Sequence, residues 1–174
     1  SGANLAHADL SGSKLTADGR DEATIRFTEA NLANANLRGS KLTAISSYAD
    51  ATIDFTQADL THADLSGSEL TAEGYDASLI DFSGANLAHA DLGGSKLTAD
   101  GREEATIEFT EADLANANLR GSKLTAISSY ADATIDFTQA DLTHADLSGS
   151  ELTAEGYDAS LIDFTQADLA HADL

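Results

Sequence analysis

Large apolar residues recur at every fifth position along most of the chain. In residues 55–70 they are Phe55, Leu60, Leu65 and Leu70. On an α-helix a step of five residues turns the side chain by about 140°, and on a flat strand an odd step alternates between the two faces. Neither structure would place the four side chains together. The spacing therefore predicts a chain that bends once in every five residues and points all four side chains inward.

The pattern repeats on two scales. Residues 1–82 recur as residues 83–164 with four changes: Ser11 to Gly93, Asp21 to Glu103, Arg26 to Glu108 and Asn31 to Asp113. Each half consists of modules with twenty residues of pentads and an insert of seven or eight residues, always at the same point. We expect a single domain, residues 1–174, whose modules are 1–27, 28–55, 56–82, 83–109, 110–137, 138–164 and a partial 165–174.

Each pentad also has fixed small and polar positions. Ala58 comes two residues before Leu60, and Asp59 comes directly before it. Small and large residues pointing inward with polar residues outward indicate a packed wall. Glycine recurs at one corner of every full module, where a tight bend can require the positive φ that glycine adopts freely. These glycines are Gly12, Gly39, Gly67, Gly94, Gly121 and Gly149.

The pentads resemble a known motif. Residues 58–62, 63–67 and 30–34 read ADLTH, ADLSG and ANLAN, which is similar to the A(D/N)LXX motif of the pentapeptide-repeat proteins. The resemblance covers about three quarters of every module. It implies an all-β fold, a right-handed quadrilateral β-helix (a β-solenoid) with four pentads per coil and Leu or Phe at the centre of each face. The insert in every coil departs from the family's pattern. The leucine-rich repeat, another solenoid of this period, needs an LxxLxLxxN segment that the sequence lacks.

The composition limits the partners that we expect. Thirty acidic and nine basic residues give a net charge of −21, which disfavours nucleic acid and anionic membranes because both would be repelled. We see no run of 18 apolar residues and no leader, so we expect neither a membrane span nor a signal peptide. The absence of Cys excludes disulfides and thiolate chemistry.

No motif for catalysis or for a cofactor stands out. We find no nucleotide-binding loop, no nucleophile with its base and no zinc motif. The sequence therefore predicts a structural or scaffold module that is not an enzyme and uses no cofactor. The near-identity of the two halves and the lack of Met point to an engineered or designed array, and a recent natural tandem duplication would look similar.

Histidine occurs at one module position only. His62 and His89 fall on adjacent coils, as do His144 and His171. Two imidazoles one strand spacing apart, roughly 4.8 Å, could share a divalent metal. A stable zinc site needs three or four convergent ligands, so these four residues are weak candidates. The alternative is an exposed polar column.

The inserts would stack at one corner and form a ridge. Tyr and Arg are favoured by binding hot spots, and loops on a rigid scaffold often carry function, so the ridge is a candidate surface for a protein partner. Alternatively, Arg and Tyr pack on one another and shield the open corner by cation–π contact. The ridge consists of Arg20, Tyr48, Tyr75, Arg102, Tyr130 and Tyr157, and we refer to it as the Tyr-Arg ridge.

Two further expectations concern partners. Some pentapeptide-repeat proteins are acidic rods that imitate DNA and inhibit DNA gyrase, and the acidity of this chain makes DNA mimicry the alternative function. The other expectation is end-to-end self-association through Leu169, Leu174 and the N-terminal coil, because no polar cap covers the apolar layers at the two ends. Like-charge repulsion would oppose this association, and salt would relieve that repulsion.

Overall fold

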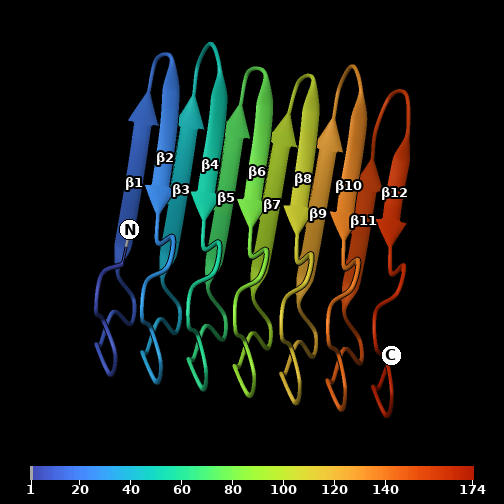
Figure 1. The fold of residues 1–174 in the computed structure, drawn as a ribbon. Coiled ribbons are helices and arrows are strands. Elements are labelled where there is room, and N and C mark those ends of the chain that lie inside the picture. Colours follow the sequence, from blue (N-terminus) through green and yellow to red (C-terminus); the bar gives the residue numbers. More distant parts are fainter. Residues whose placement is uncertain (1) are drawn as a thin grey trace.

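Each module folds into one coil with four faces, and the coils stack side by side into a rod (Figure 1). The computed structural model describes residues 2–174, so Ser1 of the predicted domain lies outside the described residues. Parallel pairing joins every coil to the next and extends into residues 165–174, which begin a seventh coil. The prediction of an all-β solenoid is confirmed. The described residues contain no helix long and apolar enough to cross a membrane.

Two faces of every full coil are strands, and they form two six-stranded parallel sheets. The first sheet contains Lys14–Gly19 (β1), Lys41–Ser46 (β3), Glu69–Gly74 (β5), Lys96–Gly101 (β7), Lys123–Ser128 (β9) and Glu151–Glu155 (β11). The second contains Glu22–Arg26 (β2), Asp50–Asp54 (β4), Ala77–Asp81 (β6), Glu104–Glu108 (β8), Asp132–Asp136 (β10) and Ser160–Asp163 (β12).

The other two faces pair through single residues, such as Asp59 with Asn86 and Asp64 with Asp91. The carboxylate of Asp59 also accepts a hydrogen bond from the N–H of Thr61 at 3.0 Å. A side chain that bonds the backbone two residues on forms an Asx turn. The Asp and Asn columns on these faces therefore stabilise the corners of the coil.

Three corners of the coil need a residue in the left-handed region. The predicted glycine corner is confirmed, with φ between 61° and 67°. The histidine position is a second such corner, where His62 has a φ of 58° and Asn34 a φ of 59°. Asn and His are among the residues enriched at positive φ, which explains why these two types share the column.

The interior is a stack of identical layers. Phe55, Phe82 and the other phenylalanines form a column whose ring centroids lie 4.8 to 5.0 Å apart with nearly parallel planes. Ile53 and its equivalents are buried beside them, except Ile162 in the last full coil. The phenylalanines occupy the every-fifth position that was predicted to point inward, and the isoleucines are buried with them because a solenoid must bury apolar residues that are in register.

The structure corrects the prediction for the inserts. They are not loops, because most of their residues continue the two strands and only a short turn remains at the tip. Ala44 and Ala51 are buried between the two sheets in this extension. Small side chains let the sheets approach closely, so the extension continues the hydrophobic core of the rod. The tips lie along one edge of the rod (Figure 1).

The residue at the end of the first-sheet strand decides the length of the turn. Gly101 precedes a turn of two residues, and a Cβ there would clash with the backbone carbonyl of Glu104. Ser128 is its register partner and precedes a turn of three residues, where its Oγ accepts a hydrogen bond from the N–H of Ala131 at 3.2 Å. The seven-residue inserts therefore need glycine, and the eight-residue inserts use serine.

Candidate functional site

The Tyr-Arg ridge lies at the tips of the strand extensions, on the turns that join the two sheets. The guanidinium of Arg102 lies 4.6 Å from the ring centroids of both Tyr75 and Tyr130, and it donates a hydrogen bond to the hydroxyl of Tyr75. Arg20 lies 5.1 Å from the ring of Tyr48, and the rings of Tyr48 and Tyr75 are 6.4 Å apart. These five residues form one continuous row across five coils. Tyr157, the sixth residue of the predicted ridge, makes no aromatic or cation–π contact within residues 2–174.

The tyrosines of the Tyr-Arg ridge stay largely open to solvent. The exposed fractions are 58% for Tyr48, 44% for Tyr75, 54% for Tyr130 and 77% for Tyr157. The Arg–Tyr contacts expected of a shielding role are present at Tyr48, Tyr75 and Tyr130, yet these residues remain exposed. The row is held in place by cation–π contacts and still presents aromatic surface.

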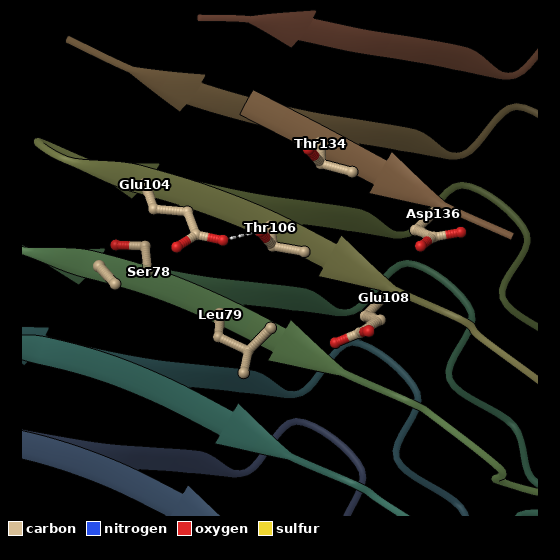
Figure 2. A pocket seen from close by; sticks show the side chains of 8 residues that line it. Ser78, Leu79, Glu104, Thr106, Glu108, Thr134 and Asp136 are labelled. Atoms are coloured by element: carbon tan, nitrogen blue, oxygen red, sulfur yellow. Dashed lines mark hydrogen bonds between the residues drawn. The ribbon is translucent and has the colours of Figure 1, made fainter. Parts of the chain in front are cut away.

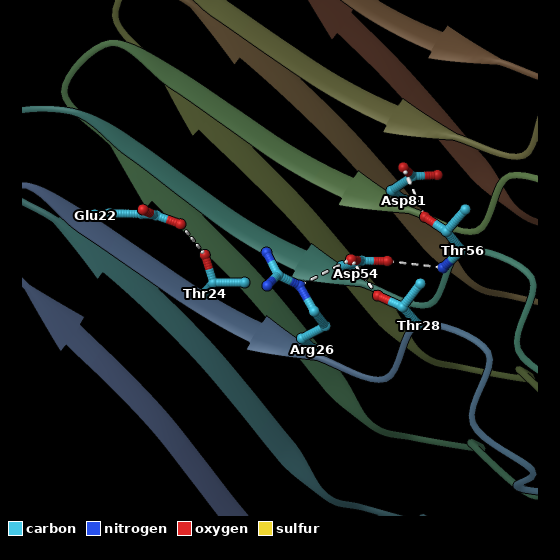
Figure 3. Close-up of polar contacts among 7 residues, drawn as sticks. All are labelled: Glu22, Thr24, Arg26, Thr28, Asp54, Thr56 and Asp81. Carbon is cyan, nitrogen blue, oxygen red and sulfur yellow. Dashed lines mark hydrogen bonds and ion pairs between the residues drawn. The ribbon is translucent and has the colours of Figure 1, made fainter. Parts of the chain in front are cut away.

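A second polar array, which sequence reasoning missed, lies on the outer face of the second sheet (Figure 3). Arg26 donates a hydrogen bond to Asp54 at 3.3 Å, the hydroxyl of Thr28 donates to the same oxygen at 2.6 Å, and the N–H of Thr56 donates to the other at 2.9 Å. Burial by itself would raise the pKa of Asp54, but these hydrogen bonds outweigh it and lower the pKa.

The array continues from Asp54 as a column of carboxylates in register. Its members each directly precede a phenylalanine of the core, which is the signal that could have revealed them. Burial, followed by the charges of Asp81 and Asp136, raises the pKa of Glu108 above its ordinary value. We refer to Asp54, Asp81, Glu108, Asp136 and Asp163 as the acidic column.

The acidic column borders a shallow hollow of about 330 Å³ on strands β6, β8 and β10 (Figure 2). The hydroxyl of Thr106 donates a hydrogen bond to Glu104 at 3.4 Å across its floor. No Lys or Arg is among the residues that line the hollow, so its carboxylates make it negative. The lining residues are Ala77, Ser78, Leu79, Glu104, Thr106, Glu108, Thr134 and Asp136.

The histidines are brought together in pairs but do not converge. The rings of His62 and His89 are stacked with centroids 4.8 Å apart and planes 11° apart, and those of His144 and His171 with centroids 4.8 Å apart and planes 9° apart. The nitrogen lone pairs lie in the ring planes, so in each pair they are directed along parallel planes rather than at one point. Among residues 2–174 no group of three or more His, Cys, Asp or Glu residues is arranged to hold a metal ion.

The repeats match a family model for pentapeptide repeats in eight copies, over residues 25–44, 53–72, 76–99, 107–126 and 135–154. These segments make up more than half of the chain. The chain belongs to the pentapeptide repeat family. No curated protein matches this pentapeptide repeat chain.

Three solved pentapeptide repeat structures are similar to it. A protein from the thylakoid lumen of Arabidopsis thaliana is 26% identical, with 68% of this chain and 66% of that protein covered and a TM-score of 0.29. The plasmid-mediated fluoroquinolone resistance protein QnrB1 is 18% identical, with coverages of 98% and 77% and a TM-score of 0.31. HetL, involved in the regulation of heterocyst differentiation in the cyanobacterium Nostoc, is 20% identical, with coverages of 99% and 90% and a TM-score of 0.20. These similarities carry no information on the function of this chain.

Proposed function

We propose that this pentapeptide repeat chain is a non-catalytic scaffold module that binds a protein partner through the Tyr-Arg ridge. One observation carries the proposal. All four tyrosines of the protein lie on the ridge, three of them in the continuous row with Arg20 and Arg102, and each is between 44% and 77% exposed. Tyr and Arg provide much of the binding energy at protein interfaces.

The scaffold supports the ridge by holding it rigid. The tip that carries Tyr48, for example, continues two strands that pair with neighbouring coils on both sides, and Ala44 and Ala51 are buried in it. Tyrosines held on a rigid element lose little conformational entropy on binding, which favours affinity. The 82-residue repeat with four changes favours an engineered array or a recent duplication as the origin of this regularity.

The experiment compares two triple variants of the ridge. Tyr48→Ala, Tyr75→Ala and Tyr130→Ala together remove the rings, whereas the three Tyr→Phe changes keep the rings and remove only the hydroxyls. A partner is first captured and identified, then purified, and its affinity is measured against each variant. We expect the Ala variant to lose binding and the Phe variant to retain most of it. Equal binding by the wild type and the Ala variant would refute the proposed function.

A second candidate function is the mimicry of DNA, as an inhibitor of a topoisomerase such as gyrase. The acidic column favours it, because five successive carboxylates follow one another across neighbouring strands at about one strand spacing, roughly 4.8 Å. Such a line of negative charge attracts proteins that bind DNA. The test is a gyrase supercoiling assay with micromolar protein. Inhibition that is lost when Glu108 and Asp136 become Gln and Asn would favour mimicry, and the absence of inhibition would exclude it.

A further inference from the structure

One position on the outer face of the first sheet places two carboxylates next to each other. Glu73 on β5 and Asp100 on β7 are register partners in adjacent parallel strands. The next residues of the same column are Ile45 on one side and Ile127 on the other. Elsewhere in this column, among the described residues, each acidic residue has an isoleucine as its neighbour. The pair and its two apolar flanks arise because two seven-residue inserts follow each other at the centre of the chain, with an eight-residue insert on either side of them.

Neither carboxylate of the pair is compensated within the protein. Among residues 2–174, the side chains of Glu73 and Asp100 take part in none of the hydrogen bonds or ion pairs, whereas Lys41 pairs with Glu69 at 3.1 Å on the same sheet. Adjacent strands are roughly 4.8 Å apart, and like charges directly opposite each other on neighbouring strands are destabilising. A cation placed between the two carboxylates would relieve this repulsion.

The space for such a cation is present beside the ridge. A hollow of about 300 Å³ lies at the ends of β3, β5 and β7, next to Tyr75. This volume is at the lower end for ligand sites and suits a single side chain. Arg102, which lies over the ring of Tyr75, is not among the lining residues. The hollow is lined by Ile45, Ser46, Ser47, Glu73, Gly74, Tyr75 and Asp100.

We infer that this hollow, the Tyr75 hollow, binds the side chain of a lysine or arginine from a basic partner segment. The ammonium or guanidinium lies between Glu73 and Asp100, and the methylene stem packs on Ile45 and the edge of Tyr75. Long basic side chains bury their stems on apolar surface in this way while the charged group stays polar. The inference rests on the proposed function, since it names the chemistry of the partner that the ridge receives.

The surrounding charge favours the same class of partner. Carboxylates such as Asp76, Glu103 and Glu104 greatly outnumber the guanidinium groups of Arg20 and Arg102 along the tips. Complementary charge speeds the encounter of partners and selects among them. A Lys- or Arg-rich segment running along the tips therefore meets a negative surface with one defined anchoring site.

The duplication supplies an internal comparison. Residues equivalent to Ile45, Glu73 and Tyr75 recur as Ile127, Glu155 and Tyr157. In this second place, β11 is the last described strand of the first sheet, so Glu155 has no carboxylate partner corresponding to Asp100. Glu155→Gln is therefore a matched control that removes the same kind of carboxylate from a site lacking the pair.

The test uses the full chain and a fluorescently labelled oligolysine peptide, with oligoglutamate of the same length as the negative probe. Anisotropy of the label gives the affinity. Because the protein has no Trp, its tyrosine emission reports binding at the ridge alone. The variant Glu73→Gln with Asp100→Asn is compared with Asp59→Asn with Asp64→Asn, which changes the net charge equally at positions where other coils carry Asn. Tyr130→Ala alters the ridge outside the hollow, and Glu155→Gln completes the set.

We expect oligolysine to change the tyrosine emission and the Glu73/Asp100 variant to bind it about tenfold more weakly. The Asp59/Asp64 and Glu155 variants should stay within about twofold of the wild type. If the Glu73/Asp100 and Asp59/Asp64 variants bind oligolysine equally weakly, net charge alone explains the effect and the inference is overturned. Loss in Tyr130→Ala without loss in Glu73/Asp100 would also overturn it, while leaving the ridge as a binding surface. Binding without any change in tyrosine emission would place the peptide elsewhere and overturn the inference as well.

Discussion

Arg26 donates a hydrogen bond to Asp54 at 3.3 Å, whereas Glu108, which replaces Arg26 in the second half, lies beside Asp136 instead. One substitution in the duplication thus converts an ion pair into a pair of like charges. The neighbouring sequence is almost unchanged between the two halves. The two positions therefore test what charge contributes in two settings, with Arg26 on the first strand of the sheet beside one carboxylate and Glu108 between two carboxylates.

The pH dependence of stability follows from the raised pKa of Glu108. The folded state holds this proton more tightly than the unfolded chain, whose Glu titrates at about 4.3. The contribution of the protonated group is thus complete below that pH and is lost as the pH rises through the folded-state pKa. We expect Glu108→Gln to raise the urea midpoint at pH 7 and to leave it unchanged below about pH 4.

The reciprocal variants provide the control. Glu108→Arg should stabilise the protein by about 0.2–1 kcal/mol at pH 7 through a pair with Asp136, and Arg26→Gln should destabilise it by a similar amount. Both are measured by urea unfolding in low salt. Stabilisation by Glu108→Gln that persists equally at acid pH would show that charge is not the cause.

The phenylalanine column should dominate the stability of the rod. Phe109 is buried between Phe82 and Phe137, so Phe109→Ala leaves a cavity that the flanking coils cannot fill. We expect a loss of about 3–5 kcal/mol. Phe164 is only partly buried, and Phe164→Ala should cost clearly less. Thermal and urea unfolding of both variants check this, and equal losses would contradict the stacked-core account.

The tip turns should differ in their tolerance of side chains. Gly101→Ala forces a Cβ against the carbonyl of Glu104, and we expect a loss of about 1–3 kcal/mol from this overpacking. Ser128→Ala removes only the hydrogen bond to the N–H of Ala131, worth about 1 kcal/mol. The measurement is the change in unfolding free energy. A neutral Gly101→Ala would mean that the tip adjusts freely.

The contribution of the histidine corner to stability should depend on the backbone conformation of the residue there and not on its imidazole ring. His62 has a φ of 58°, so His62→Val places a β-branched residue in the left-handed region at a cost of about 1–2 kcal/mol. His62→Asn should be nearly neutral, because Asn34 adopts the same conformation at the equivalent corner. Both variants lack the imidazole. Equal destabilisation in the two would indicate a role for the stacked ring itself.

End-to-end association remains our prediction for this 174-residue chain. Leu161 and Ile162 in the last full coil are 47% and 40% exposed, and Leu174 in the partial seventh coil is 75% exposed. Sedimentation in about 0.5 M salt, where the Debye length is only a few ångströms, should show dimers or longer rods. Leu169→Glu with Leu174→Glu should restore the monomer. A wild-type chain that stays monomeric at every salt and protein concentration would contradict the prediction.

The sequence by itself determined the coil. A large residue at every fifth position can be buried throughout only if the chain bends once in every five residues, so the inward Leu and Phe positions follow from spacing alone. The four-faced solenoid follows from the resemblance of the pentads to the A(D/N)LXX motif. The glycine corner follows as well, since it needs a φ that few other residues adopt freely. These features depend on contacts that recur in every module, and their repetition allows them to be predicted from the sequence.

Tertiary structure decided the form of the inserts and the surfaces on them. The inward positions at the start of this insert are Leu42, Ala44 and Ser46. So short an alternation does not by itself distinguish a strand from a loop. Parallel neighbours that provide hydrogen-bond partners on both sides make it a strand. The extra residue of the longer inserts enters the turn after Ser46 and not the strand, which keeps both sheets in register. That register sets Glu73 beside Asp100 and Glu108 between Asp81 and Asp136. Such neighbours lie 27 or 28 residues apart in the chain, so only the stacking of the coils brings them together.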